Sequence, residues 1–128
     1  MGNYGFVYGF GSQSDPGMTG FSWRRIGPSS CWAASRANYN RWIERRPCPG
    51  EALWPSARVA YRYAAVIDFN YRKPVIGRGS GIFLHAQTGR ATRGCVSLRE
   101  RDLLAVLRWL RPDTRIVIGT TASLRALK

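Results

Sequence analysis

Hydrophobic and polar residues alternate along much of the chain, and this alternation predicts short β-strands. It is clear in YGFVYGF (residues 4–10) and again in GFSWRRI (residues 20–26). Two later runs, Ala57–Asn70 and Ile82–Ala86, are rich in β-branched and aromatic side chains. We predict that these two runs form the central strands of the core, with the flexible loop Gly77–Gly81 leading into the second.

A helical period replaces this alternation toward the C-terminus. Four apolar residues recur at the spacing of one helix face: Leu103, Val106, Leu107 and Leu110. Ser97 and Glu100 have the spacing of a capping box, which predicts a helix from about Leu98 to Leu110 with Ser97 as its N-cap. Pro112 ends this helix before a final predicted strand over Arg115–Gly119.

The segment between the first strands and the central runs is harder to assign, because aromatic residues cluster there between prolines. A short helix is predicted around Asn38–Arg45, since Tyr39, Trp42 and Ile43 are spaced for one helix face. The order of these elements favours a mainly β domain with one long helix over an alternating βαβ arrangement.

Length and composition limit the chain to one globular domain. It has 128 residues, of which 45% are hydrophobic and 21% charged, which excludes a disordered or fibrous chain and leaves room for one core. We expect a single domain over residues 1–120 and a loose C-terminal tail over residues 121–128. No apolar run approaches the ~20 residues that span a bilayer, and the first residues do not resemble a signal peptide.

Charge is the strongest compositional feature. Twenty Lys and Arg against seven Asp and Glu give a formal net charge of +13, and eighteen of the twenty cations are Arg. Such a surplus attracts nucleic acid, anionic lipid or acidic wall polymers. The arginines are spread from Arg24 to Arg125 without a long basic run, which favours an arginine-biased solvated surface over a dedicated nucleic-acid tail. We expect non-specific binding to anionic polymers.

The chain has three cysteines, so at least one thiol remains if two of them pair. Cys31 and Cys48 either form a disulfide or stay as two buried thiols, and their spacing does not decide between these states. Three cysteines and one histidine would be enough ligands for a zinc ion. Zinc binding is nevertheless disfavoured, because no CxxC or HxxxH spacing is present. We expect neither a metal nor another cofactor.

Cys95 is the candidate nucleophile. It lies just before the predicted N-cap Ser97, where the positive end of the helix dipole favours a thiolate. Arg93 and Arg99 add positive charge close to it in sequence, and Gly94 allows a sharp turn that leaves room for a substrate carbonyl. These features predict a thiol that is substantially ionised near neutral pH.

His85 is the candidate acid–base partner of Cys95. It is the only histidine, it lies near the end of the predicted strand Ile82–Ala86, and a polar loop joins it to Cys95. A positioned imidazole next to a thiol is the usual arrangement for cysteine acyl transfer. The alternative is a purely structural role for both residues, because most single cysteines are small buried apolar residues.

Two segments resemble the active-site motif of the L,D-transpeptidase (YkuD-like) family. They are Gly79–His85 and Thr92–Leu98, and in that family a strand-end His is followed by [Ser/Thr]-x-Gly-Cys-[Ile/Val]-x-[Leu/Met]. Further similarity to a bacterial subgroup with a short His-to-Cys spacer lies in YNRW (residues 39–42), VIDFN (residues 66–70) and LRWLRPDTRIVIG (residues 107–119). The resemblance covers roughly residues 30–120.

The resemblance implies a β-sandwich-like catalytic domain that acts on peptidoglycan outside the cytoplasmic membrane, in the cell wall or periplasm. Cys95 would form an acyl-enzyme with a stem peptide and pass the acyl group to an amine of another stem, while His85 moves the protons. Backbone N–H groups near Gly94 and Cys95 would stabilise the oxyanion. Thr92, Arg93 and Arg99 would contribute to substrate binding, and we expect a monomer.

The chain departs from the family pattern at several positions. Many members have His directly before the Gly-Cys pair and Arg two residues after the Cys, where this chain has Arg93 and Ser97. Arg99 or Arg93 is expected to take over recognition of the substrate carboxylate. A Thr-Pro-x-Gly segment is not found, so we expect the chain to begin partway into the domain, with a sheet incomplete at its N-terminal edge. The alternative function is a non-catalytic basic binding protein of the same fold.

Overall fold

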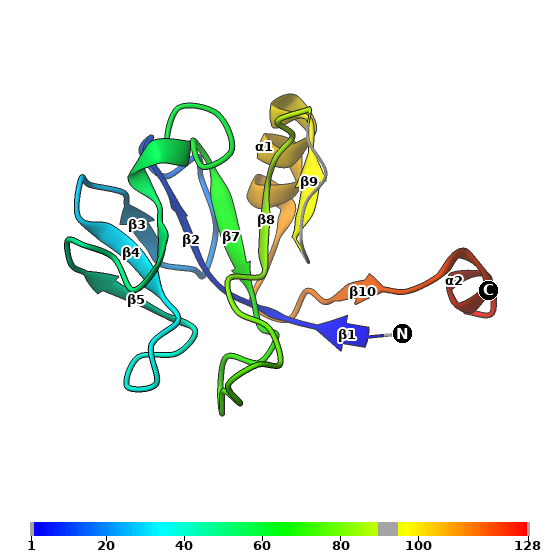
Figure 1. Cartoon of the computed structure of the whole chain (residues 1–128). Coiled ribbons are helices and arrows are strands. Elements are labelled where there is room, and N and C mark those ends of the chain that lie inside the picture. The colour runs from blue at the N-terminus through cyan, green and yellow to red at the C-terminus, as the bar shows by residue number, and fades with distance from the viewer. Residues whose placement is uncertain (1, 90–94, 128) are drawn as a thin grey trace.

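The computed structural model describes residues 2–89 and 95–127, and its main body consists of two β-sheets and one long helix (Figure 1). The five-stranded sheet has the order β3-β2-β7-β8-β9, and the three-stranded sheet has the order β5-β4-β6. The strands of the larger sheet are β2 (Phe6–Gly11), β3 (Trp23–Arg25), β7 (Ala64–Ile67), β8 (Phe83–Ala86) and β9 (Val96–Leu98). Those of the smaller sheet are β4 (Ser30–Ala33), β5 (Arg41–Glu44) and β6 (Gly50–Ala52).

Two hydrophobic cores hold these layers together. The first core lies between the two sheets and includes Phe10, Trp32, Trp42, Leu53 and Phe83. The second core lies between the five-stranded sheet and the helix α1 (Glu100–Trp109) and includes Phe6, Ile67, Leu84, Leu103 and Leu107. The arrangement is a β-sandwich with one helix on its outer face, which confirms the predicted fold class.

Strand β2 contributes to both cores because of an irregularity in its pairing. Residues four apart in a regular strand point to the same face, yet Phe6 faces the second core and Phe10 the first. The register with β7 shifts between Phe6 and Gly9, and a bulge of this kind reverses the side-chain alternation beyond it. One strand therefore links the helix layer to the smaller sheet.

The long helix is confirmed, but its predicted N-cap is wrong. The helix begins at Glu100 with Arg99 as N-cap, and no side chain caps it. Ser97 lies instead in β9, where it pairs with His85 of β8 in parallel register. Ser97 cannot both pair with β8 and cap the helix, and it adopts the strand conformation.

Two other local predictions also fail. The short helix predicted around Asn38–Arg45 is absent, because Asn40 has the positive φ of 58° that breaks a helix and the chain continues as β5. Only Ala64–Ile67 of the run Ala57–Asn70 forms a strand, β7, and the residues before it form turns after a short 3₁₀ helix over Trp54–Ser56.

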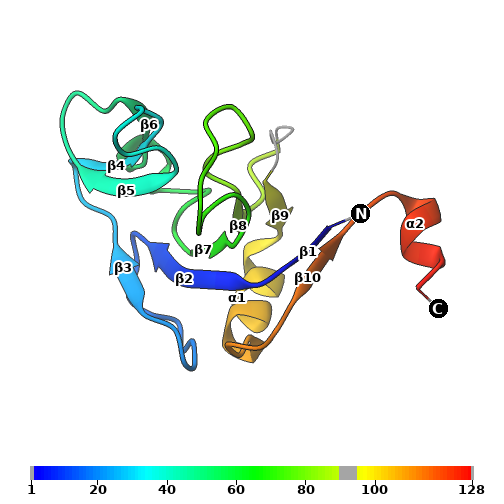
Figure 2. The same ribbon diagram turned by 90° about the horizontal axis from the view of Figure 1, so that it is seen from below.

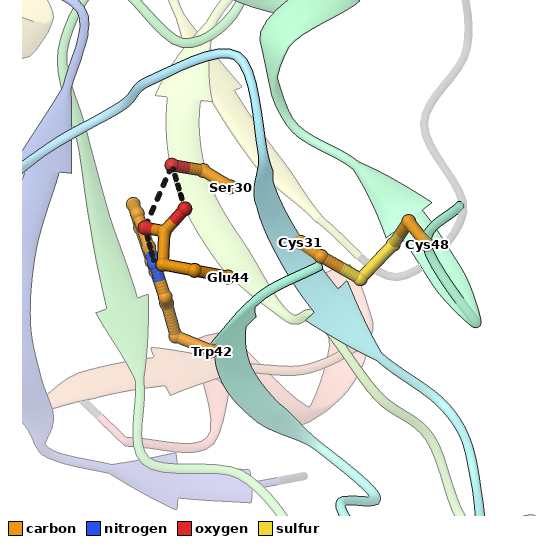
Figure 3. The surroundings of a disulfide bond; sticks show 5 residues. All are labelled: Ser30, Cys31, Trp42, Glu44 and Cys48. Atoms are coloured by element: carbon orange, nitrogen blue, oxygen red, sulfur yellow. Dashed lines mark hydrogen bonds between the residues drawn. A yellow bond between two sulfur atoms is a disulfide. The ribbon is translucent and has the colours of Figure 1, made fainter. Parts of the chain in front are cut away.

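A disulfide joins Cys31 and Cys48, with the two Cα atoms 5.6 Å apart (Figure 3). It attaches β4 to the segment between β5 and β6. Near it, Glu44 accepts hydrogen bonds from the Ser30 hydroxyl at 3.1 Å and from the Trp42 indole at 3.0 Å. The smaller sheet is therefore held by a covalent bond and by hydrogen bonds to the exposed Glu44 carboxylate.

The two ends of the described chain form a separate ribbon (Figure 2). Strand β1 (Gly2–Tyr4) pairs antiparallel with β10 (Ile116–Ile118), which confirms the predicted final strand. The segment expected to be a loose tail contains a short helix, α2 (Thr121–Arg125), because the Thr120 side chain accepts a hydrogen bond from the Ser123 backbone. No helix in the described part of the chain is long and apolar enough to cross a membrane.

Candidate functional site

His85 is held inside the sandwich by strand pairing. It lies in β8 between Ala64 of β7 and Ser97 of β9, and only 5% of its surface is exposed. Its Nδ1 atom lies 2.8 Å from the carbonyl oxygen of Ala86. A carbonyl only accepts, so Nδ1 carries the proton and donates it, which leaves Nε2 as the basic nitrogen of the neutral ring.

Cys95 lies directly before β9, and the parallel register places it next to β8. Leu84 pairs with Val96 and His85 with Ser97, so Cys95 lies opposite Phe83. Because side chains alternate along a strand, His85, two residues after Phe83, points to the same face as Cys95. The structure thus brings the predicted nucleophile and the predicted base together on one face of two neighbouring strands.

The immediate surroundings of the thiol are largely apolar. Cys95 is half-buried against the first core, and its Sγ atom donates a hydrogen bond to the Gly81 carbonyl at 3.2 Å. Burial raises the pKa of the Cys95 thiol, a hydrogen bond with the Phe83 backbone lowers it, and the negative charge of Glu51 raises it further. The net direction is upward, so the resting group is a thiol.

This direction corrects the expectation of a thiol substantially ionised near neutral pH. That expectation rested on a helix starting near Leu98, whose dipole would favour the anion at Cys95, and on the nearby charges of Arg93 and Arg99. The helix begins only at Glu100, after the intervening strand β9, and the effect of a helix dipole is confined to about its first turn. Burial is therefore the main influence on the pKa of the Cys95 thiol.

Tyr61 lies between His85 and Glu51 and was not found by sequence reasoning. Its ring meets the His85 imidazole edge to face, with centroids 5.6 Å apart and an interplanar angle of 87°. Its hydroxyl donates a hydrogen bond to Glu51 Oε2 at 2.5 Å. Burial raises the pKa of Tyr61, and the charge of Glu51 and the hydrogen bond with it raise it further. Tyr61 is therefore a neutral phenol that acts only as a donor to Glu51.

Asn40 is a second residue that sequence reasoning missed. Its buried side chain accepts hydrogen bonds from Trp32 Nε1 at 2.8 Å and from the Gly81 backbone at 3.0 Å. It donates to the carbonyls of Asn70 at 2.6 Å and Phe69 at 3.3 Å. All four hydrogen-bonding positions of the amide are satisfied. These bonds hold in place the segment around Gly81, whose carbonyl accepts the hydrogen bond from Cys95 Sγ.

The predicted substrate-binding residues are only partly placed. Thr92, Arg93 and Gly94 lie outside the described residues. Arg99 is exposed, and its Nε atom lies 3.3 Å from Asp102 Oδ2 on the first turn of α1. The structure therefore directs the Arg99 guanidinium toward the helix.

A separate basic hollow of about 610 Å³ lies between the end of β2 and the segment before β7. Its lining includes three guanidinium groups, from Arg25, Arg58 and Arg62, and the indole of Trp54, which is 47% exposed. The Arg62 side chain is also paired with Glu100 at 2.7 Å. Arginines beside an aromatic face provide contacts for anionic ligands with flat surfaces.

Metal-ligating side chains do not gather in the described part of the chain into a group that could hold an ion. The family model of YkuD, the L,D-transpeptidase catalytic domain, matches residues 9–118. This range includes both sheets of the sandwich apart from the first half of β2, the helix α1 and the pair His85 and Cys95. No curated protein and no solved structure matches the chain at a significant level.

Proposed function

Because the chain belongs to the YkuD family of L,D-transpeptidase catalytic domains, we propose that it transfers peptidoglycan stem peptides through an acyl-enzyme on Cys95. The observation that supports this most is the placement of Cys95 and His85 on one face of two parallel strands. The half-buried thiol and the buried imidazole have the chemistry that acyl transfer needs.

The first half-reaction uses His85 as a general base, because the resting thiol is protonated. As Sγ of Cys95 attacks the donor carbonyl, its proton passes to Nε2 of His85, the nitrogen left basic by the Nδ1 contact with Ala86. Backbone N–H groups of Gly94 and Cys95 are the proposed donors to the oxyanion. The amide C–N bond then breaks, and the leaving amine takes the proton back from His85.

The second half-reaction returns the enzyme to its resting state. An amine of a second stem attacks the thioester carbon, the C–S bond breaks, and the sulfur recovers a proton. Thr92, Arg93 and Arg99 are the proposed contacts to the stem peptide, since their sequence positions surround the nucleophile.

The proposed setting is extracytoplasmic, in the cell wall or periplasm, and the proposed working form is a monomer. The disulfide between Cys31 and Cys48 supports this location, because such bonds persist in oxidising compartments and are rare in the reducing cytosol.

Non-specific binding to anionic polymers is a second candidate function, and the basic hollow is the observation that favours it. The charge of +13 and the arginines beside Trp54 would hold an acidic wall polymer or a nucleic acid by counterion release. This binding is compatible with catalysis, because it uses a different part of the surface.

The decisive experiment is intact-protein mass spectrometry after timed exposure to a carbapenem-type β-lactam, which mimics the acyl donor. We expect one adduct on the wild type, mapped to Cys95, and none on Cys95→Ser, because a hydroxyl lacks the nucleophilicity of a thiolate. Circular dichroism of the variant supplies the control for folding. A wild type that stays unmodified, or an adduct that persists in folded Cys95→Ser, would show that Cys95 is not the nucleophile.

A further inference from the structure

Glu51 is a carboxylate that has no cationic partner among the residues that the structure describes. Four other acidic residues form ion pairs with arginine: Glu44, Asp68, Glu100 and Asp102. Within residues 2–89 and 95–127, no Lys or Arg lies within ion-pair distance of Glu51. Its hydrogen-bond donor is the phenol of Tyr61, which brings no positive charge to the carboxylate.

Strand pairing and the Tyr61 hydroxyl set the position of the Glu51 carboxylate. Glu51 lies in β6, where its backbone pairs with Trp32 of β4, and it is exposed to solvent. The Tyr61 hydroxyl holds one carboxylate oxygen, and the same ring contacts the His85 imidazole. The carboxylate therefore stands at the solvent side of the site, one side chain away from His85.

A negative charge at this position opposes formation of the thiolate at Cys95, because like charges in a partly buried site repel each other. It therefore does not assist the nucleophile in the first half-reaction. It suits the second half-reaction instead, in which an amine must reach the thioester. A free amine of a stem peptide is protonated near neutral pH, and a carboxylate attracts the ammonium group.

We propose that Glu51, held by Tyr61, binds the ammonium group of the acyl acceptor beside the Cys95 thioester. This inference rests on the proposed function and assigns Glu51 as the residue that binds the acceptor amine, which arrives as a cation. It also assigns Tyr61 as a positioning residue, because its hydroxyl holds the carboxylate and its ring meets His85.

The transfer step balances with these groups. The bound ammonium gives one proton to Nε2 of His85 and becomes a neutral amine. Its nitrogen attacks the thioester carbon, the new C–N bond forms, and the C–S bond breaks. The nitrogen loses its second proton to the departing sulfur of Cys95, and His85 releases the first proton to solvent.

The test compares two acceptors on the same acyl-enzyme. Protein is incubated with a synthetic tetrapeptide donor whose last bond joins an L-centre to a D-residue. The acceptors are Nα-acetyl-lysine amide, which is cationic at pH 7, and hydroxylamine, which is neutral at that pH. Mass spectrometry gives the ratio of the two transfer products, and this ratio does not depend on the fraction of protein that is folded.

For Glu51→Gln we expect this cationic-to-neutral ratio to fall roughly tenfold, the usual worth of one charge-assisted hydrogen bond. Tyr61→Phe retains the ring against His85 and removes only the hydroxyl, so the ratio should fall in the same direction by a smaller factor. Asp113→Asn is the matched control, because it removes one exposed carboxylate from the turn after α1. Its ratio should equal that of the wild type.

The possible results separate this inference from the proposed function. An unchanged ratio in Glu51→Gln overturns the ammonium site, as does an equal loss of both products, which would indicate a structural role. A wild type that forms no acyl-enzyme before any acceptor is added overturns the proposed function itself, and the acceptor site with it.

Discussion

The side-chain oxygen of Asn40 accepts a hydrogen bond of 3.0 Å from the backbone of Gly81, a residue 41 positions away in sequence. The Gly81 carbonyl in turn accepts the hydrogen bond from Cys95 Sγ. The same Asn40 oxygen receives the Trp32 indole N–H from the smaller sheet. One amide therefore links the smaller sheet to the segment that holds the thiol.

Replacing Asn40 with alanine should lower the free energy of unfolding by several kcal/mol, about 1–3 for each buried partner left unsatisfied. The Trp32 indole N–H and the Gly81 N–H would both lose their acceptor. Urea denaturation followed by tryptophan fluorescence measures the loss. Asn38→Ala, in the preceding turn, is the control and should change stability by less than about 0.5 kcal/mol. Equal stability of the two variants would contradict the role given to Asn40.

Replacing His85 with alanine should slow acylation of Cys95 by about 10²- to 10⁴-fold, the usual contribution of a positioned acid–base group. The effect should be largest near neutral pH and shrink in alkaline solution, where the thiol ionises without help. Timed mass spectrometry of the β-lactam adduct gives the rate, and circular dichroism checks the fold. A folded variant that reacts at the rate of the wild type would assign His85 a structural role only.

Stability should fall in alkaline solution in a way that depends on Cys95. Burial raises the pKa of its thiol above the ordinary value of 9.0 that it regains on unfolding. The folded state thus holds this proton more tightly, so the contribution is complete below the unfolded pKa and is lost as pH rises through the folded pKa. We expect the wild type to lose more stability than Cys95→Ser between pH 8 and pH 10.5, measured by urea denaturation. Parallel curves for the two proteins would be inconsistent with a raised pKa.

Replacing both Cys31 and Cys48 with serine should leave acylation of Cys95 intact and lower the free energy of unfolding by ~2–4 kcal/mol. The disulfide closes a loop between β4 and the segment before β6, on the sheet opposite His85. Dithiothreitol should destabilise the wild type and leave the double variant unchanged, which identifies the bond as the cause. Loss of acylation in a folded double variant would place the reactive cysteine elsewhere.

Binding to anionic polymers should be non-specific and should weaken steeply with salt, because it depends on release of condensed counterions. Fluorescence anisotropy with labelled DNA at rising salt concentration measures the slope. Removing Arg25 and Arg58 from the basic hollow should reduce this slope by about two, one for each lost phosphate contact. A sequence-selective complex that resists salt would instead favour a dedicated nucleic-acid-binding protein.

The sequence was sufficient to single out His85 and Cys95 as the candidate pair, because both lie in short contiguous segments with a recognisable pattern. The strand Ile82–Ala86 was also predictable, since its apolar run follows a glycine-rich segment. The helix face of Leu103 and Leu107 was visible for a similar reason, because helical periodicity is a local property.

The supporting residues were not predictable, because each depends on contacts between distant segments. Tyr61 and Glu51 come from a turn and a strand outside the motif, and they reach the site only when the two sheets pack. Asn40 looked like part of a helix until its positive φ and its buried hydrogen bonds were known. Ser97 satisfied a capping pattern, but pairing with β8 placed it in a strand.

The parallel pairing of β8 and β9 also has a consequence for which genetic changes this protein tolerates. Successive side chains in a strand point to opposite sides of the sheet. One residue added to or removed from Val96–Leu98 would therefore turn every later side chain of the strand to the other side, or shift the pairing with β8 that positions Cys95. Conservative substitutions at these half-buried positions would preserve the alternation. Insertion or deletion scanning should therefore reveal β9 as essential even where substitution scanning finds it permissive.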